Sequence, residues 1–385
     1  MPYRKELADV ANRGLERIIR DRSCTGAAPA ASSARIMLEN KQLVHFSSND
    51  YLGLANHPLL KDAAAGALEA CGTGGMASRL MAGGTTYHHA LEEAIARLKG
   101  TEAALALNSG YTANTSLIPA LAREGDLILS DALNHASIVD GCRLSRSRTV
   151  IYRHRDVAHL RQLLASESGT RKIIVTDTVF SMDGDIAPLP DIVTACREHG
   201  ALLYIDDAHG TGVLGGGRGT LHHFGITPEP WIIQMGTFSK ALGSFGAYVA
   251  ASRTIIRWLI NSGRGFIFST ALPAPVVAAS LAAVELIERD SALNKKLWEN
   301  RNYLADELHK IGIDTAPSET PIIPVMVGDI ETTLAAAQKL FDQGIYAPAI
   351  RPPTVPTPRL RITVSAAHTR EEIELLCTLL KEVMK

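Results

Sequence analysis

Short apolar segments alternate with amphipathic ones through residues 126–235. The short segments are typical of buried strands, whereas the longer ones carry apolar residues at helical spacing. The expected strands lie in DLILSD, TVIYRH, KIIVTD, ALLYID and WIIQM, and the expected helices in HASIVDGCRL, VAHLRQLLAS and LPDIVTACREHG. This alternation is typical of a mainly parallel sheet with helices on its faces. The pattern therefore predicts an α/β fold.

The flanking regions predict further elements. Residues 3–22 combine spaced apolar residues with many charges, which predicts an amphipathic helix. After Pro275, two helices or one interrupted helix precede strands in TPIIPVMVGD and RLRITVS and a capped last helix. We expect three parts, which are an N-terminal helix and arm (1–44), a large α/β domain (45–275) and a small C-terminal α+β domain (276–385).

Composition narrows the class of protein. The 385 residues are 46% hydrophobic, which is enough for a large core. A net charge of -1 gives no electrostatic attraction to nucleic acid or to an anionic membrane. The five cysteines are scattered without a CxxC pair, which argues against a disulfide framework and fits a reducing compartment. A charged N-terminus and the lack of an 18-residue apolar run predict a cytoplasmic protein.

Lys240 is the first candidate for chemistry. It follows the apolar segment WIIQM and lies in a loop rich in Gly, Thr and Ser. A lysine that is held at a strand end and removed from water has a lowered pKa, so its free amine can act as a nucleophile or base. Such a lysine can form a Schiff base with a carbonyl cofactor. A solvated surface lysine is the alternative, and partners elsewhere in the chain must decide between the two.

Polar residues follow four of the expected strands. They are His135, Ser181 with Asp183, residues 206–209 and residues 237–240. Ligand-binding residues of α/β proteins gather at the carboxyl ends of strands. Another segment, ALNSGY, leads from an expected strand into a helix whose first amides would suit a phosphate. We therefore expect these segments to form one ligand site.

Asp206 closes the apolar run ALLYI, and a buried carboxylate is costly unless it meets a cation. A protonated pyridine nitrogen is such a partner. His209 could donate a hydrogen bond to a ring hydroxyl oxygen, and His135 could stack on a planar ring. Metal ligation by these three residues and Asp207 is an alternative, but it leaves Lys240 without a role. A nicotinamide site is not expected, because no GxGxxG follows the first strand and opens a helix.

Several segments resemble one enzyme family. The similarity lies in SSNDYLGL, SDALNHASIVDGCRLS, VTDTVFSMDGDIAPL, YIDDAHGTGVLG, GTFSKALGSFG, FIFSTALPAP, AIRPPTVP and RLRITVSAAHT. In order and spacing these segments resemble the α-oxoamine synthases, which are pyridoxal 5'-phosphate (PLP) enzymes of fold type I. The resemblance runs from about Leu38 to the C-terminus. It implies an aspartate aminotransferase-like fold, with a mainly parallel seven-stranded sheet in the large domain and a smaller C-terminal α+β domain.

The resemblance also implies roles for single residues. Lys240 matches the lysine that binds the PLP aldehyde and serves as base, and Asp206 matches the partner of the pyridine nitrogen. His209 matches the neighbour of the phenolic oxygen, and His135 the histidine that stacks on the ring and meets the substrate. Further PLP-binding positions are Gly110, Tyr111, Ser181, Thr237, Ser269 and Thr270. The last two would reach the phosphate from a partner subunit, which implies a homodimer with shared active sites.

Substrate-binding positions follow from the same resemblance. Arg361 matches the arginine that binds the amino-acid carboxylate, with Asn49 as a neighbouring polar contact. Ser78 stands where some family members have a bulkier threonine against the substrate Cα, which would leave room for a methyl group. Arg17 and Thr354 match positions that meet the acyl substrate.

The reaction implied is the condensation of an amino acid with an acyl thioester and the loss of CO2. The segments GLERIIR and AIRPPTVP favour L-alanine and a pimeloyl thioester, on coenzyme A or acyl carrier protein, as in the biotin-pathway members. Because Arg20 and Arg22 lie close to Arg17, the arginine that meets the acyl chain stays open. Glycine with acetyl-CoA is the alternative substrate pair. A non-catalytic relative would be marked by loss of the lysine or the aspartate, and both are present.

Overall fold

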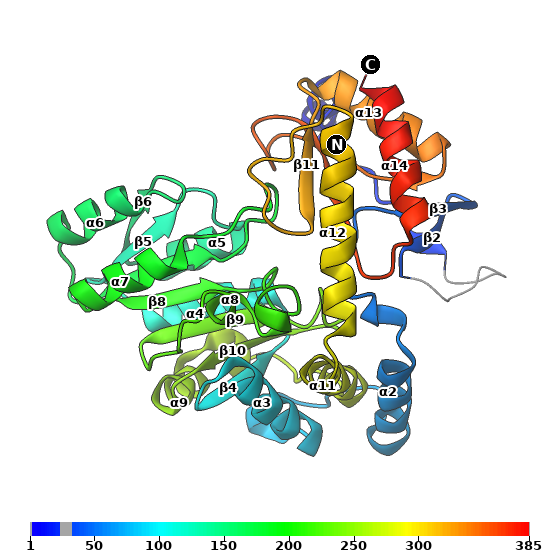
Figure 1. Cartoon of the computed structure of the whole chain (residues 1–385). Coiled ribbons are helices and arrows are strands. Elements are labelled where there is room, and N and C mark those ends of the chain that lie inside the picture. The colour runs from blue at the N-terminus through cyan, green and yellow to red at the C-terminus, as the bar shows by residue number, and fades with distance from the viewer. Residues whose placement is uncertain (1, 24–32, 385) are drawn as a thin grey trace. The chain divides into compact units, whose positions relative to one another are not determined.

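The computed structural model describes residues 2–23 and 33–384 (Figure 1). Cys24 lies outside the described residues, and the other four cysteines are free thiols. The chain forms two compact units. One comprises residues 54–181 and 185–294, and the other comprises residues 1–53, 182–184 and 295–385. By contrast with the three parts expected from the sequence, the N-terminal residues share a unit with the C-terminal ones, and residues 276–294 belong to the larger unit.

A seven-stranded sheet forms the centre of the larger unit (Figure 1). Its strands, in chain order, are β4 (Ala103–Leu107), β5 (Leu127–Asp131), β6 (Arg148–Tyr152), β7 (Lys172–Asp177), β8 (Leu202–Asp206), β9 (Ile232–Thr237) and β10 (Ala247–Ala251). The spatial order is β4-β10-β9-β8-β7-β5-β6. Neighbouring strands from β9 to β6 are parallel, and β10 is antiparallel to both of its neighbours. The expectation of a mainly parallel seven-stranded sheet is confirmed.

Helices cover both faces of this sheet or pack against the covering helices. They are α2 (Pro58–Cys71), α3 (Thr86–Lys99), α4 (Gly110–Leu121), α5 (Ala136–Leu144), α6 (Val157–Ser166), α7 (Leu189–His199), α8 (Thr220–His223), α9 (Arg253–Ser262), α10 (Arg264–Ile267) and α11 (Ala274–Arg289). One buried cluster joins the sheet to α4, α5 and α9, and a second joins it to α6 and α7. Both clusters consist mostly of fully buried aliphatic side chains, so the strand ends are held on a rigid scaffold.

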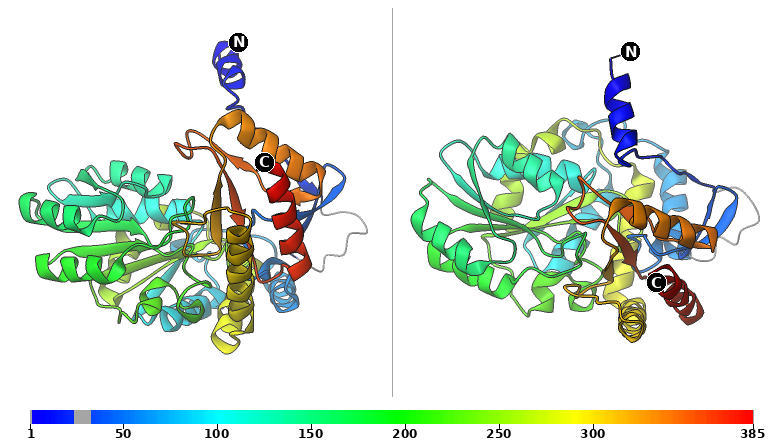
Figure 2. Two further views of the ribbon diagram at one scale, coloured as in Figure 1. Left: turned by 45° about the horizontal axis from the view of Figure 1, so that its top comes forward. Right: turned by 90° about the horizontal axis from the view of Figure 1, so that it is seen from above.

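Among its described residues, the smaller unit has two sheets and the long helices α12, α13 and α14, which can be followed in Figure 2. The antiparallel sheet β11-β14-β13 comprises β11 (Ile322–Met326), β13 (Ala349–Ile350) and β14 (Arg359–Thr363). The second sheet comprises β1 (Arg22–Ser23), β2 (Arg35–Leu38), β3 (Lys41–His45) and β12 (Ile345–Tyr346). The helices are α12 (Ala292–Lys310, in this unit from Lys295), α13 (Ile330–Asp342) and α14 (Arg370–Val383). Thr369 and Glu372 form a capping box at the start of α14, as the sequence predicts.

The N-terminal helix is shorter than the sequence predicts. Helix α1 spans Arg4–Asn12 rather than residues 3–22, and it has no buried residue. Gly14 follows with a positive φ of 64°, a conformation that ends a helix easily. Arg351 donates hydrogen bonds to the carbonyl oxygens of Gly14 and Glu16, at 2.7 and 2.5 Å. The prediction was wrong because these long-range bonds hold the segment after Gly14 outside a helix.

A histidine joins two strand ends and the loop after β7. His154 Nδ1 lies 2.9 Å from Asp131 Oδ1, and its Nε2 lies 2.8 Å from Asp185 Oδ2. Burial alone would lower the pKa of His154, but the hydrogen bonds and charges of Asp131 and Asp185 raise it to about 9. Both ring nitrogens therefore carry protons at neutral pH, and the imidazolium ties the loop that contains Ser181 to the sheet.

We expect this histidine to make stability fall at alkaline pH. Its pKa is about 9 in the folded chain and 6.5 as the unperturbed value, so its contribution is complete below pH 6.5 and lost as pH rises through 9. The loss amounts to roughly 3 kcal/mol at most. The measurement is the free energy of unfolding from pH 6 to 10 for the wild type and His154→Gln. The difference between the two chains should shrink as pH rises, and parallel curves would contradict the assignment.

Candidate functional site

The carboxyl ends of three parallel strands meet at one place in the larger unit. Asp177 at the end of β7 pairs in register with Asp206 at the end of β8, and Asp206 pairs with Met235 in β9. A cavity of about 240 Å³ opens there. Its lining includes Ser109, Gly110, Tyr111, His135, Ser137, Asp177, Ser181, Asp206, Ala208, His209, Met235, Thr237, Ser239 and Lys240. The structure thus brings most of the polar residues that were expected to form one site into the lining of a single cavity.

Lys240 lies in the turn between β9 and β10. It is half-buried and follows Thr237, whose hydroxyl donates to the Gly246 carbonyl oxygen at 2.7 Å across the turn. The Gly243 amide donates to the Lys240 carbonyl oxygen at 2.9 Å, with a positive φ of 61°. A Cβ at Gly243 would lie 2.4 Å from the Ala55 amide nitrogen, so only glycine fits. The turn therefore holds Lys240 in one position beside the cavity.

Asp206 is buried at the floor of the cavity. Its Oδ2 accepts a hydrogen bond from Asn114 Nδ2 at 2.8 Å, and its Oδ1 accepts one from the Ala208 amide at 3.0 Å. Burial raises the pKa of Asp206, although Lys240 and these two hydrogen bonds act in the opposite direction. The carboxylate therefore has less positive charge near it than its burial requires.

A second buried carboxylate lies beside Asp206 and was missed at the level of sequence. Asp177 Oδ2 accepts a hydrogen bond from the His135 amide at 2.6 Å, which sets where the histidine lies at the start of α5. Burial and the charge of Asp206 raise the pKa of Asp177 well above its usual range. With two buried carboxylates at adjacent strand ends, the cavity carries more negative charge than the positive groups near it can balance. The signal that could have found Asp177 is the one used for Asp206, because Asp177 also closes an apolar run, KIIVTD.

Another part of the cavity lining suits an anion. Ser109 caps α4 by accepting a hydrogen bond from the Thr112 amide at 3.1 Å. The first amides of the helix, at Gly110 and Tyr111, have no acceptor within the helix and line the cavity. The Thr237 and Ser239 hydroxyls lie 2.6 Å apart in the same lining. A phosphate at this place would meet amide and hydroxyl donors.

These features fit PLP. The buried carboxylates call for a cation, which a protonated pyridine nitrogen would supply. The amides at the start of α4 and the hydroxyls suit its phosphate, and an amine beside the cavity suits its aldehyde. Among the described residues no group of His, Cys, Asp and Glu could hold a metal ion, so the alternative of metal ligation finds no support there.

No helix in the described part of the chain is long and apolar enough to cross a membrane.

Three candidate residues in the larger unit lie away from this cavity. Ser78 and Thr270 pair as an isolated antiparallel bridge, and the Thr270 carbonyl oxygen accepts a hydrogen bond from Asn108 at 2.9 Å. Ser269 lines a separate, very small pocket with Arg79. Within one chain, these residues therefore do not line the site of Lys240.

The remaining candidates lie in the smaller unit and form two pairs. Arg361, on β14, is buried and its guanidinium donates to Asn49 Oδ1 at 3.2 Å. Arg17 donates to the Thr354 hydroxyl at 2.9 Å. Both pairings join residues that are more than 300 positions apart in the sequence.

Comparisons with known proteins show the family and the fold of the chain. Residues 41–380 match the family model for class I and II aminotransferases. The chain is 50% identical to 8-amino-7-oxononanoate synthase of Geobacter sulfurreducens over 96% of this chain and 94% of that one. It is 49% identical to the enzyme of the same name from Geobacter metallireducens, over 100% and 98% of the two chains.

Solved structures add the cofactor. A serine palmitoyltransferase with PLP superposes with a TM-score of 0.91 at 30% identity, covering 98% of this chain and 96% of that one. An 8-amino-7-oxononanoate synthase from Francisella tularensis gives a TM-score of 0.77 at 26% identity, with coverages of 88% and 97%. The cofactor of the protein is PLP. The chain belongs to the class I and II aminotransferase family and, within it, to the α-oxoamine synthases, the PLP-dependent acyltransferases of fold type I.

Proposed function

We propose that the protein is an 8-amino-7-oxononanoate synthase of biotin biosynthesis, which acts in the cytoplasm. It would condense L-alanine with a pimeloyl thioester and release 8-amino-7-oxononanoate, CO2 and the free thiol. The proposal is supported by the relatives of that name from the two Geobacter species. The observation that carries the PLP chemistry is the shared cavity of Lys240 and Asp206, because the reaction needs an amine and a buried acid beside one cofactor.

In this proposal each residue of the cavity has its own role in the reaction. When bound, PLP supplies a ring that withdraws electrons from the amino-acid Cα. Asp206 would keep the ring nitrogen protonated, and His209, which is buried and lines the same cavity, would donate a hydrogen bond to the phenolic oxygen. The amine of Lys240 would bind the aldehyde in the resting enzyme, and as a base it would remove the Cα proton and return a proton after the loss of CO2. One side chain thus serves as both anchor and base.

Phosphate binding would involve residues of two subunits. Gly110, Tyr111, Ser181 and Thr237 line the cavity and offer donors from one chain. Ser269 and Thr270 do not line it, which fits their proposed role in the neighbouring site of a homodimer. The expected active form is therefore a homodimer with shared sites.

Arg361 is proposed to bind the carboxylate of alanine, with Asn49 holding its guanidinium. Replacing Arg361 with lysine keeps the charge but removes the planar fork that binds a carboxylate with two hydrogen bonds. We expect the KM for alanine to rise about tenfold with a smaller change in kcat, because one charge-assisted hydrogen bond is lost. Steady-state kinetics with alanine varied at saturating thioester measures the effect. A raised KM for the thioester alone would contradict the assignment.

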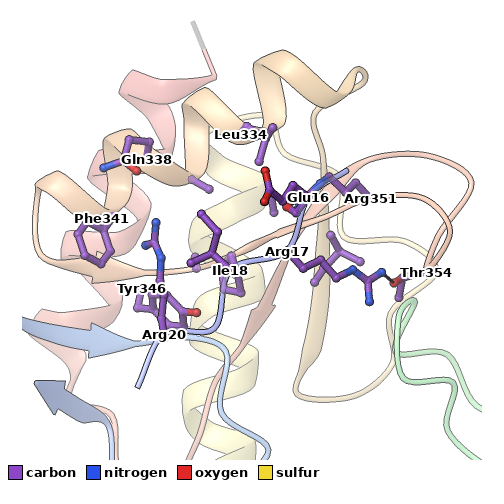
Figure 3. Close-up of a pocket in the computed structure, with 15 residues that line it drawn as sticks. Glu16, Arg17, Ile18, Arg20, Leu334, Gln338, Phe341, Tyr346, Arg351 and Thr354 are labelled. Atoms are coloured by element: carbon purple, nitrogen blue, oxygen red, sulfur yellow. Dashed lines mark hydrogen bonds between the residues drawn. The ribbon is translucent and has the colours of Figure 1, made fainter. Parts of the chain in front are cut away.

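The acyl chain is proposed to bind in a pocket of the smaller unit (Figure 3). The pocket has a volume of about 460 Å³ and combines apolar side chains, such as Ile18 and Leu334, with Arg17 and Arg20. Figure 3 shows Arg17 directed toward Thr354, whereas Arg20 lies near Phe341 and Tyr346. The guanidinium of Arg20 lies 5.0 Å from the centre of the Phe341 ring and 3.3 Å from Glu39. Arg17 is therefore the better candidate for the far carboxylate of a pimeloyl chain.

Single substitutions should separate the two arginines. Arg17→Ala is expected to raise the KM for the pimeloyl thioester roughly tenfold, because a hydrogen bond to a charged group is lost. Arg20→Ala is the matched control, since it removes the same charge from the same pocket. It should change the KM for the pimeloyl thioester less than about threefold, because an exposed ion pair contributes little free energy. Equal effects of the two substitutions would contradict a specific role for Arg17.

The substrate pair is tested with the purified protein and PLP. Alanine and glycine are each paired with pimeloyl-CoA, pimeloyl acyl carrier protein, acetyl-CoA and succinyl-CoA, and thiol release is measured together with the mass of the product. The expected result is a preference for alanine with a pimeloyl thioester. A preference for glycine with acetyl-CoA would replace this function with that of a 2-amino-3-ketobutyrate ligase.

A further inference from the structure

Asn114 joins two groups of the site although it does not line the cavity. It lies in the middle of α4 and is completely buried. Its Nδ2 donates to Asp206 Oδ2 and to Ser137 Oγ, each at 2.8 Å. Its Oδ1 accepts a hydrogen bond from the Tyr204 hydroxyl, also at 2.8 Å. All the hydrogen-bonding directions of this amide except one lone pair of Oδ1 are therefore used.

The chemistry of the neighbours fixes the orientation of the amide. A carboxylate only accepts hydrogen bonds, so the group that faces Asp206 must be the NH2. The rotated amide would place its oxygen against Asp206, 2.8 Å away, and would leave Tyr204 facing a second donor. The Tyr204 hydroxyl adds a fixed donor to Oδ1. The second hydrogen of the NH2 group therefore points at Ser137.

The next bond runs from Ser137 to His135. Because Ser137 Oγ accepts from Asn114, its own hydrogen is available for His135 Nδ1, which lies 2.7 Å away. The Ser137 amide also donates to Nδ1, at 3.2 Å. A backbone amide can only donate, so Nδ1 is the unprotonated nitrogen of a neutral imidazole. Desolvation lowers the pKa of His135 and favours the neutral ring, with Lys240 acting in the same direction and Asp206 opposing.

We propose that Asn114 is a positioning residue for His135. Through Ser137, Asn114 holds the His135 ring as the tautomer that carries its proton on Nε2. The other amide hydrogen of Asn114 is donated to Asp206. One buried amide thereby sets the donor and acceptor directions at two groups of the cavity. The Tyr204 hydroxyl is the fixed end of this chain of hydrogen bonds.

This arrangement has a chemical consequence that rests on the proposed function. A neutral imidazole with its proton on Nε2 offers a hydrogen-bond donor to the cavity, where it can stabilise an oxygen that gains negative charge, such as that of a thioester carbonyl under attack. An imidazole with the proton on Nδ1 would offer a lone pair instead and would repel that oxygen. The tautomer itself does not depend on which substrates the enzyme uses.

The tautomer is measured by NMR of the full chain with 15N-labelled histidine, with and without PLP. The chain contains 13 histidines, and His135→Gln identifies the signals of His135 by their loss. We expect a protonated Nε2 and an unprotonated Nδ1 in the wild type. Ser137→Ala should move the Nδ1 resonance and populate the other tautomer, because one of the two donors to Nδ1 is lost. Ser318→Ala, which removes a buried serine hydroxyl in the smaller unit, is the control and should leave the His135 resonances in place.

A second measurement separates the effect of Asn114 on His135 from its effect on Asp206. Ser137→Ala should leave the PLP affinity within about twofold and lower kcat by a few-fold to tenfold, the worth of one neutral hydrogen bond. Asn114→Ala should alter the His135 resonances and also weaken PLP binding, because Asp206 loses a donor. If Asn114→Ala unfolds the chain, Tyr204→Phe provides the milder change with the same two readouts. A protonated Nδ1 in the wild type, or His135 resonances unchanged by Ser137→Ala, would overturn the proposal whichever substrates the enzyme uses.

Discussion

Replacing Lys240 with alanine is expected to lower turnover by at least about 10⁴-fold, the upper range for losing one acid–base group. The loss should be this large because the same amine holds the cofactor and moves the Cα proton. PLP should still bind, since the phosphate and ring-nitrogen partners of the cavity remain. Treatment with borohydride followed by peptide mass analysis should find reduced cofactor on Lys240 in the wild type and none on the variant.

Lys240→Arg is the control for this prediction. It keeps the positive charge beside Asp206 but lacks the primary amine, so it should fold and bind PLP yet stay as inactive as the alanine variant. Added methylamine should restore part of the activity of Lys240→Ala, because a small amine can take the place of the missing side chain. Substantial activity in Lys240→Arg would show that charge, and not the amine, is what the site needs.

Replacing Asp206 with asparagine should have opposite effects on the two forms of the protein. With PLP, we expect activity to fall by about 10² to 10³-fold, because a buried cation loses its partner. Without PLP, the variant should be more stable than the wild type at neutral pH, because burial raises the pKa of Asp206 and makes its charge costly to keep. Thermal unfolding of Asp206→Asn and of the wild type, each with and without PLP, measures these opposite effects, and PLP titration measures the change in affinity.

Asp207 provides the matched control. Its Oδ2 accepts a hydrogen bond from Lys99 at 2.7 Å, with both side chains buried. Burial acts to raise the pKa of Asp207, but the charge of Lys99 and several hydrogen bonds lower it. Asp207→Asn should therefore destabilise the chain with and without PLP, since it leaves Lys99 buried without a counter-charge. A similar loss in Asp206→Asn without PLP would contradict the argument that the cavity lacks a cation.

Much of the larger unit could be predicted because its strands are buried on both faces. Apolar runs such as KIIVTD and ALLYID became β7 and β8, and the polar residues that follow them met in one cavity. Strand β10, with the sequence AYVAA, was missed. Its strand character comes from antiparallel pairing with β4 and β9, which no local pattern records.

The supporting residues of the site were harder to predict than those that line it. Asn114 lies within α4, where a polar residue reads as one more position of a helix face. Its partners Ser137 and Tyr204 come from α5 and β8, so their meeting depends on how two helices and a strand pack. The mistaken length of α1 has the same origin, since Arg351 acts on residues more than 300 positions away. Contacts of this range leave no periodic signal in a sequence.

The tight turn around Gly243 has a consequence for protein engineering. Because hydrogen-bonded strands fix both of its ends and the Ala55 amide lies directly against it, the loop has a fixed number of residues. An inserted or deleted residue would rotate the reactive amine out of line without disturbing either strand. Libraries meant to broaden substrate choice should therefore vary side chains elsewhere in the protein and leave the length of this loop unchanged.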